Sequence, residues 1–310
     1  MTRPFITVVL LIIAATLFNC SSDSTPQTET TSFSKMERKS ISYINSSGEL
    51  FDNGITSDSI VFLLNSNKII SYSGLVDMDH IEKMIHGELE YQNNKLYKIT
   101  QFEDNALLST LTYHYDDNGD LSEMFSEPTY SPVKSKLQFV KQNDTIYVKR
   151  YFSENDAPYV ESYDSPLYKI VMDENENRIF YGNSQGTSSY EYLYENNNLV
   201  SLDYINGTHN YTYGSAINSE NYILKNTLGK QHLAIFFDRS SLRLMNSYVF
   251  PLRHQYINEQ IITAFNLATQ QLAPYEIEHE INDSNFSTKT TISQWLNGNL
   301  RTIYETRFIE

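Results

Sequence analysis

The segment YHYDDNGDL, residues 113–121, decides between two very different folds. Its three aspartates and one asparagine surround a single glycine, as in calcium-binding loops and in tight hairpin turns. An EF-hand loop beginning at Asp116 would need glycine at its sixth position and glutamate at its twelfth. Leu121 occupies the sixth position instead and Gly119 comes too early, although Glu127 does stand at the twelfth. The spacing therefore argues against a calcium loop.

The same residues match a β-hairpin. Tyr113 and Tyr115 alternate along the strand that precedes the turn. Asn118 and Gly119 are the pair expected to adopt positive φ, and Leu121 resumes the second strand. Short polar side chains suit turns, which accounts for the aspartates without a metal ion. We therefore predict a hairpin and no metal site.

Hairpin patterns of this kind recur along the chain. Each has an apolar or aromatic run, a turn rich in Asn, Asp or Gly, and a second run. They occupy 88–102 with a turn at Asn93–Asn94, 136–152, 170–181 around Asn175–Asn177, 190–204 around Asn196–Asn198, and 294–308 around Asn297–Gly298. Such a tandem series predicts a meander in which strands that are neighbours in sequence pair in space.

Alternation within the runs indicates strands with one buried face. In YEYLYE (190–195) the three tyrosines share a face, and in YEIEHEI (275–281) the three glutamates oppose Tyr275 and His279. One aromatic and one charged face is typical of an antiparallel sheet with a solvated side. The predicted fold is mainly β: an antiparallel meander forming a broad curved sheet or an open barrel-like sandwich, with one or two short helices.

Two segments lack the hairpin pattern. Residues 259–273 place apolar side chains at helical spacing before Pro274, which favours a helix, although a short strand pair also fits. Residues 215–250 contain LAIFFDRSSLRLM, which is interpreted as a buried strand followed by a turn. We expect the 215–250 segment to cap an open end of the sheet and cover apolar surface there.

The amino terminus has the pattern of an exported, lipidated protein. A short basic start and an apolar run of this length predict a secretory signal over 1–19. Cys20, the only cysteine, lies where the run ends and Leu17 three residues before it, which resembles the lipobox of bacterial lipoproteins. Residues 20–34 are rich in Ser and Thr and predict a tether, followed by one β-rich domain over 35–310.

Net charge limits the partners. The chain carries 23 basic and 38 acidic side chains, a formal charge of −15. Such a chain repels nucleic acid, so no DNA or RNA partner is expected. Once Cys20 is acylated, no thiol is left for a disulfide or a zinc–thiolate site.

The segment 113–121 also resembles the YD, or Rhs-type, repeat, whose pattern is roughly Tyr-x-Tyr-Asp-x-x-Gly-x-Leu. With its lipobox-like start, the chain is similar to YD-repeat-like lipoproteins of Bacteroidetes. This resemblance implies O-glycosylation of Asp-Ser/Thr motifs, here at Ser24, Ser59 and Thr145. It does not imply the shell that long Rhs arrays build around a toxin, because half a dozen degenerate hairpins are too few.

The sequence contains no recognisable catalytic set. The phosphate-loop, dinucleotide, nucleophile-elbow and zinc-protease motifs are absent from the sequence. His80 and His86, in DMDHIEKMIH, are interpreted as part of an exposed polar connector, and the glutamates at 276, 278 and 280 as a solvent face. We therefore predict no catalytic residue, no metal ligand and no cofactor.

These features favour a non-enzymatic cell-envelope lipoprotein that serves as a scaffold or as a binding surface for a glycan or protein. The alternatives are a surface-polysaccharide hydrolase and an assembly partner of an outer-membrane protein. The membrane is the expected partner through the lipid at Cys20. Ser21 is not the aspartate that retains some lipoproteins in the inner membrane, so we expect the outer membrane, with its periplasmic and surface faces both open.

Overall fold

The computed structural model describes residues 31–44, 50–78, 81–183, 189–204, 207–236, 258–266, 275–296 and 299–310. The chain divides into two compact units, Met1–Thr31 and Ser32–Glu310. All described strands and helices belong to the second unit, which is described by itself below.

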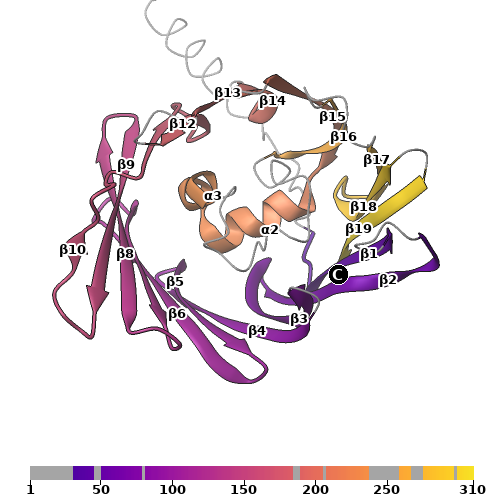
Figure 1. Cartoon of the computed structure of the whole chain (residues 1–310). Coiled ribbons are helices and arrows are strands. Elements are labelled where there is room, and N and C mark those ends of the chain that lie inside the picture. The colour runs from indigo at the N-terminus through magenta and orange to yellow at the C-terminus, as the bar shows by residue number, and fades with distance from the viewer. Residues whose placement is uncertain are drawn as a thin grey trace, which may run out of the picture. The chain divides into compact units, whose positions relative to one another are not determined.

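A single antiparallel sheet of 19 strands forms this unit and curves until it is nearly closed (Figure 1). Its strands are β1 (Lys35–Ile44), β2 (Leu50–Asn65), β3 (Lys68–Met78), β4 (Ile81–Gln92), β5 (Lys95–Glu103), β6 (Ala106–Tyr115), β7 (Leu121–Pro128), β8 (Val133–Gln142), β9 (Thr145–Glu154), β10 (Val160–Glu161), β11 (Tyr168–Met172), β12 (Arg178–Asn183), β13 (Ser189–Glu195), β14 (Asn198–Tyr204), β15 (Gly207–Ile217), β16 (Gln260–Asn266), β17 (Tyr275–Ile281), β18 (Ser287–Leu296) and β19 (Asn299–Ile309).

The strands pair in chain order, as the meander predicts. β1 pairs with both β2 and the last strand, β19, so the first and last described strands meet in the wall. β9 pairs with β8 on one side and with β10 and β11 on the other. The predicted fold class, mainly β with an antiparallel meander and barrel-like curvature, is confirmed.

The wall has a seam between β16 and β17, whose described strand ladders are with β15 and β18. Side chains bridge it: His279 Nε2 lies 2.9 Å from the carbonyl oxygen of Ile262, and the rings of Phe265 and Tyr275 are 4.9 Å apart. At one end of the seam, the Ile217 amide donates to the Asn285 carbonyl at 2.8 Å. These contacts connect the two sides of the seam.

The tight turns follow the chemistry expected of hairpins. Asn93 and Asn94 have φ of 50° and 67°, and Asn196 and Asn197 have φ of 49° and 61°. Two consecutive residues with positive φ form a type I′ turn, whose twist matches that of the two paired strands. Asparagine tolerates this region better than other residues with a Cβ, so the asparagine-rich turns are explained.

The 113–121 turn is a hairpin as predicted, but its geometry corrects the expected Asn118–Gly119 pair. Only Gly119 in this turn has positive φ, at 85°. Asp116 organises the turn, because its carboxylate accepts hydrogen bonds from the amides of Asn118 at 3.0 Å and Asp120 at 2.9 Å. Aspartate therefore serves as a turn-forming side chain here, as the hairpin interpretation requires.

The two sheet faces differ as the alternation predicts. In 190–195 the tyrosines are buried or half-buried, whereas Glu191, Leu193 and Glu195 are exposed. The buried faces turn inward and form one apolar core, which includes Phe62, Leu96 and Ile99. The enclosed space is therefore filled by side chains and helices.

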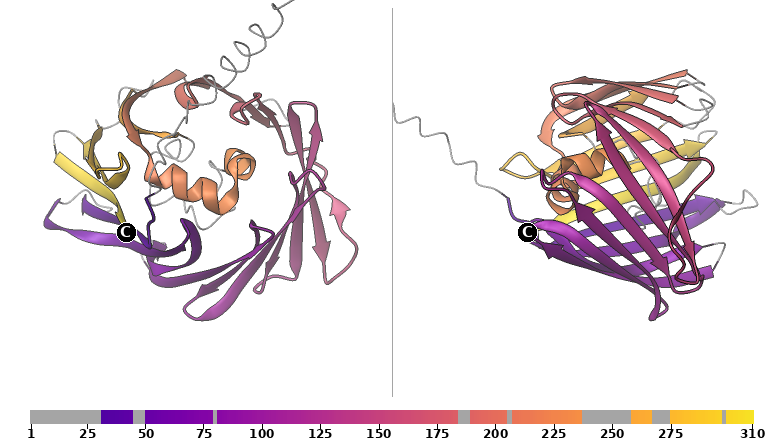
Figure 2. Two further views of the ribbon diagram at one scale, coloured as in Figure 1. Left: turned by 180° about the vertical axis from the view of Figure 1, so that it is seen from behind. Right: turned by 90° about the vertical axis from the view of Figure 1, so that its left-hand side faces the viewer.

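Two helices lie inside the curved sheet: α2 (Ser219–Leu228) and α3 (Lys230–Phe236) (Figures 1 and 2). The side chain of Asn218 caps α2 by accepting from the Glu220 and Asn221 amides, and Gly229, with φ of 84°, ends it. The expectation that this region covers apolar surface is confirmed, because Ile223, Leu224 and Leu228 are buried.

Two sequence predictions are wrong in this region. Residues 260–266 form strand β16, although helical spacing favoured a helix, because β15 offers them a pairing edge over Asn210–Ile217. Residues 233–236 belong to α3, although LAIFF was interpreted as a strand. Tertiary packing overrides local propensity in both segments. Residues 237–250 and 267–273 lie outside the described residues.

Bulges recur at the same place in successive hairpins, and the helices use them. One residue is skipped in the pairing just after the turn, at Ile70 in β3 and at Ser122 in β7. The neighbouring Ile69 amide donates to Thr227 Oγ1 at 3.0 Å, and the Leu121 amide donates to Gln231 Oε1 at 2.9 Å. Side chains of α2 and α3 thus satisfy backbone groups that the bulges release from the ladder.

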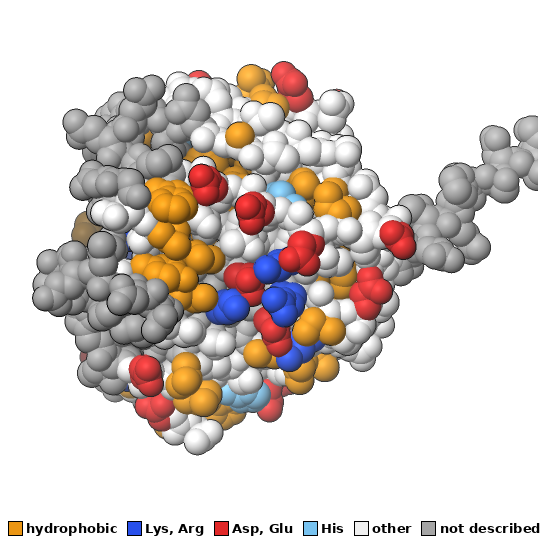
Figure 3. Space-filling model, turned by 90° about the vertical axis from the view of Figure 1, so that its right-hand side faces the viewer, with side chains coloured by type: hydrophobic (Ala, Val, Ile, Leu, Met, Phe, Trp, Pro, Cys, Tyr) orange, Lys and Arg blue, Asp and Glu red, His pale blue; other side chains and the backbone are white. Residues whose placement is uncertain are grey.

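Ion pairs connect neighbouring strands on the outer face of the sheet. Lys98 lies 2.8 Å from Glu90, and Lys136 lies 3.0 Å from Glu123. Lysine and arginine intermingle with acidic side chains on the face that Figure 3 shows, where β1, β18 and β19 contribute Lys39–Glu305 at 3.0 Å and Lys289–Glu305 at 3.2 Å. The described outer wall therefore mixes paired charges with exposed apolar side chains such as Leu75 and Met84.

Candidate functional site

One hollow among the described residues lies at the end of the sheet where α2 meets α3. It is a cleft of about 400 Å³ between the α2–α3 junction and the β4–β5 and β6–β7 turns. We call it the cap cleft; its lining residues are Lys68, Asn93, Asn94, Lys95, Tyr115, Gly119, Asp120, Glu176, Lys225, Asn226, Thr227, Leu228, Gly229, Lys230, Gln231 and His232. A volume of this size falls in the range of about 300–1,000 Å³ that is typical of small-ligand sites.

Two lysines in the cap cleft are placed by the hairpin repeat. Lys68 begins β3 and its Nζ donates to the Asn94 carbonyl at 2.8 Å, in the next turn. Lys95 begins β5 and its Nζ donates to the Gly119 carbonyl in the turn after that. Each lysine thus reaches from one hairpin to the next, and partial burial lowers the pKa of Lys68.

A tyrosine lies beneath each of these lysines. Lys68 Nζ is 5.2 Å from the ring centre of Tyr91, and Lys95 Nζ is 4.9 Å from that of Tyr115. These distances are within reach of a cation–π interaction. Burial raises the pKa of Tyr115 to about 12, so its phenol stays protonated and the two lysines keep neutral neighbours.

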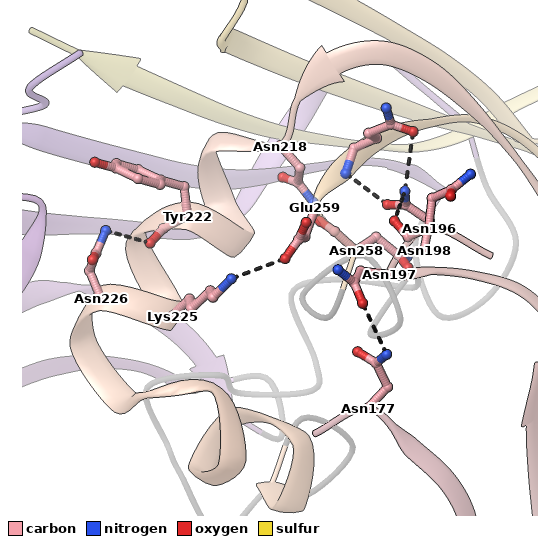
Figure 4. A network of polar contacts seen from close by, with 11 residues as sticks. Asn177, Asn196, Asn197, Asn198, Asn218, Tyr222, Lys225, Asn226, Asn258 and Glu259 are labelled. Atoms are coloured by element: carbon pink, nitrogen blue, oxygen red, sulfur yellow. Dashed lines mark hydrogen bonds and ion pairs between the residues drawn. The ribbon is translucent and has the colours of Figure 1, made fainter. Parts of the chain in front are cut away.

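An amide-rich network borders the cap cleft, around a separate space of only about 20 Å³ (Figure 4). Asn177 Nδ2 donates to Asn197 Oδ1 at 3.2 Å, which joins the β11–β12 and β13–β14 turns. Lys225 of α2 is paired with Glu259 at 3.0 Å. Asparagine side chains present a donor and an acceptor together, so this wall suits ligands with paired hydroxyl or amide groups.

The residues predicted to be modified do not lie in the cap cleft. Cys20 and Ser24 lie outside the described residues. Ser59 is exposed within β2, opposite Lys39 of β1 and Leu75 of β3. Thr145 begins β9 and its hydroxyl donates to Asp144 Oδ1 at 3.0 Å. Glycosylation at these positions stays a prediction.

The DMDHIEKMIH segment is not the polar connector that the sequence indicates. Its described residues form the facing ends of β3 and β4, which pair from Ser71 to Met78 against Ile81 to Glu88. His80 lies outside the described residues, and His86 is on the exposed face of β4 beside Glu88 at 3.4 Å. The polar composition reflects a solvated hairpin.

The glutamate row of β17 faces solvent, as its alternation predicts. Glu276, Glu278 and Glu280 are all exposed, and Glu280 pairs with Lys289 at 3.4 Å. Carboxylates of a glycosidase flank a bond within a pocket. An open outer face does not provide that arrangement.

Within the part of the chain that the structure describes, no three His, Cys, Asp or Glu side chains gather as they would around a metal ion. Within the same part, no helix combines the length and apolar character needed to span a bilayer.

Sequence reasoning missed the cap cleft because its lysines lie far apart in the chain. A local signal does exist, since Asn67-Lys68 and Asn94-Lys95 repeat the same pair directly after a hairpin turn. What the sequence does not reveal is that Lys225 and Lys230, on the helices, fold against them.

No protein-family model matches the chain, and no curated protein matches it. Among solved structures it is similar to a porin-like protein from Bacteroides uniformis, with 13% identity, coverage of 90% of this chain and 97% of that chain, and a TM-score of 0.41. A porin-like protein from Bacteroides vulgatus shows 9% identity, coverage of 89% and 98%, and a TM-score of 0.27. Similarity this weak leaves the function of the chain to be argued from its own residues.

Proposed function

We propose that this chain is a non-enzymatic, lipid-anchored protein of the cell envelope that binds a glycan in the cap cleft. The observation that carries the binding role is the cleft itself, whose wall is built from turn amides, lysines and the α2–α3 junction. Amide and ammonium groups offer the hydrogen bonds that sugar hydroxyls and ring substituents require. Tyr115 adds an aromatic ring at the same place.

The lysines on the outer wall support a domain that works in water while a lipid supplies the attachment. A strand face that borders hydrocarbon carries an apolar band, and a lysine near the bilayer midplane costs about 2–4 kcal/mol. Here Lys98, Lys136 and Lys289 occupy outward positions on three separate strands. A lipid at Cys20, followed by a tether with a reach of roughly 20 Å, keeps such a domain at the membrane surface.

Attachment is tested by replacing the acylated sulfur. Cys20→Ser is expected to abolish incorporation of labelled palmitate and to move the protein from the membrane fraction into the supernatant. The unchanged chain, expressed in parallel, is the control for export. Membrane partition that survives the substitution contradicts the anchor. Protease treatment of intact cells then distinguishes the surface from the periplasmic face of the outer membrane.

Ligand binding is tested with the detergent-solubilised full chain on a panel of immobilised envelope and capsule oligosaccharides. Asn226→Trp places a bulky ring in the cap cleft, whereas Ser73→Trp places one on the exposed face of β3. We expect binding to survive the β3 substitution and to fall at least about tenfold with Asn226→Trp. The proposed function would be wrong if Asn226→Trp left glycan binding unchanged. It would also be wrong if no glycan on the panel bound.

We also propose that the hairpins are degenerate YD-type units. The supporting observation is a contact shared by successive hairpins, in which a tyrosine before the turn lies under a lysine of the previous hairpin. Tyr115 is the second tyrosine of the 113–121 pattern, and Tyr91 occupies the equivalent place in the hairpin before it.

A further inference from the structure

Most described lysines outside the cap cleft are paired with carboxylates, although Lys169 lies over the Phe180 ring instead. On the outer wall, Lys39, Lys98 and Lys136 each lie within 3.0 Å of a glutamate oxygen. Lys134, Lys149 and Lys289 are likewise paired with carboxylates, at 2.8 to 3.4 Å. Carboxylates therefore neutralise these lysines.

Two lysines of the cap cleft bond to uncharged partners instead. Lys68 and Lys95 donate to backbone carbonyl oxygens, which carry no net charge. Among the described residues, no carboxylate lies within ion-pair distance of Lys68, Lys95 or Lys230. Three ammonium groups that lack an acidic partner thus gather in one hollow of a chain whose net charge is −15.

The acidic side chains that line the cleft do not neutralise these three lysines. Asp120 is paired with Lys141, at 2.6 Å, from outside the cleft. Lys225 is neutralised by Glu259 at 3.0 Å. That leaves Glu176 as the acidic lining residue without a described ion pair, against three lysines. The cleft is therefore locally positive.

Burial disfavours the charge on one of these lysines. Partial burial lowers the pKa of Lys68, which means that the fold disfavours its charged form. The protein nevertheless holds Lys68 and Lys95 in place by hydrogen bonds to the turns and by the rings of Tyr91 and Tyr115. Cations that are fixed in advance lose little side-chain entropy when an anion binds.

We infer that the ligand of the cap cleft is an acidic oligosaccharide, whose carboxylate or sulfate groups meet Lys68, Lys95 and Lys230 while its hydroxyls meet the amides of Asn93, Asn94 and Asn226. This inference rests on the proposed function and names its ligand class. Nucleic acid, which is also anionic, is disfavoured because its long uniform charge meets the field of the whole acidic chain.

Matched sugars test the inference by calorimetry on the detergent-solubilised full chain. Trigalacturonate is compared with galactotriose, and sulfated lactose with lactose, so that each pair differs only in its anionic groups. We expect each acidic sugar to bind at least about tenfold more tightly than its neutral partner. This preference should shrink as salt rises from about 0.05 to about 0.5 M, because salt screens exposed charges.

Substitutions of single lysines test which of them produces the preference for acidic sugars. Lys230→Gln is expected to weaken binding of the acidic sugars about tenfold and to leave neutral sugars unchanged, whereas Lys230→Arg retains the preference. Lys98→Gln, on the outer wall, is the matched control and should change neither. Potassium phosphate alone is included as an anion without a sugar.

The outcomes separate the two proposals. If neutral and acidic sugars bind equally well and Asn226→Trp blocks both, the acidic preference is wrong while the glycan site stands. If phosphate binds as tightly as the acidic sugars, the site recognises anions and the saccharide assignment falls. If no sugar of either kind binds, both the inference and the proposed function are overturned.

Discussion

The Tyr115 hydroxyl donates a hydrogen bond to the carbonyl oxygen of Leu96, 2.9 Å away. One hairpin earlier, Tyr91 makes the same contact with the carbonyl of Ile69 at 2.5 Å. Tyr213 donates likewise to Leu199 farther along the sheet. Each acceptor stands next to a bulge, so the tyrosine satisfies a carbonyl that the strand ladder has released. This contact gives a physical reason for a tyrosine before each of these turns.

Tyr115→Phe should therefore destabilise the fold although it keeps the ring. The substitution leaves a half-buried carbonyl without its donor, which typically costs about 1–3 kcal/mol. Tyr130→Phe is the matched control, because Tyr130 is 71% exposed. Urea unfolding followed by tyrosine fluorescence measures both changes. Equal stability of the two variants would show that the Leu96 contact contributes nothing.

The helices are fastened to the wall by a buried ion pair between Arg38 of β1 and Glu220 of α2. The two side chains are 3% and 1% exposed. Glu220→Gln removes the charge that balances the Arg38 guanidinium, and such changes cost about 3–5 kcal/mol. Replacing both residues, Arg38→Met with Glu220→Leu, should cost less than Glu220→Gln alone. A double-mutant cycle by chemical denaturation checks this order, which would be reversed if the pair were not coupled.

Buried histidines make the fold sensitive to acid. His232 of α3 is 2% exposed, its ring lies 4.9 Å from that of Tyr113, and burial lowers its pKa to about 3. The unfolded chain binds a proton at this residue below about pH 6.5, and the folded chain does not until about pH 3. Unfolding is therefore favoured by about 1.4 kcal/mol for each unit that the pH falls within this window.

His232→Phe should remove this part of the acid sensitivity. The free energy of unfolding, measured in urea at pH 7, 6, 5 and 4, is expected to fall less steeply with acid in the variant. His86→Phe is the control, since the His86 side chain is 40% exposed on β4. Because carboxylates titrate equally in all three proteins, the difference in slope isolates His232. Parallel slopes for wild type and His232→Phe would contradict the assignment.

Local patterns predict most of the wall because its strands pair with their neighbours in the chain. Alternation in 190–195 and paired asparagines at 93–94 are read within a few residues, so they fix faces and turns directly. The exceptions depend on distant partners. β16 becomes a strand through its pairing with β15, across a segment of the chain that includes both helices.

The candidate site was hidden for the same reason. Lys68 and Lys95 follow turns in a visible pattern, but Lys225 and Lys230 reach the cleft only through the packing of α2 and α3. Short helices inside a sheet-rich chain have weak sequence signals, because buried on several sides they need no strict amphipathic spacing. Sequence reasoning therefore located the capping segment without its helices.

Gly119 links turn geometry to the cleft, and substitution separates its two roles. With φ of 85° it adopts a conformation that costs other residues roughly 1–2 kcal/mol. A Cβ at this position would also lie 2.1 Å from Lys95 Nζ, which forces the flexible end of that lysine away from the Gly119 carbonyl. Gly119→Ala should thus lower stability by about 1–2 kcal/mol and also weaken binding of trigalacturonate.

Gly54→Ala, in β2 and outside the cap cleft, is the matched control for general destabilisation. Gly54 has φ of 64°, and a Cβ there would lie 2.6 Å from Ile41 Cγ2. This variant should lose stability through backbone strain, by about 1–3 kcal/mol, while its acidic-sugar preference stays intact. Thermal unfolding and calorimetry with trigalacturonate measure the two properties on the same samples. If both glycine variants weakened sugar binding equally, the loss would follow from general destabilisation, and Lys95 would have no separate part in the cap cleft.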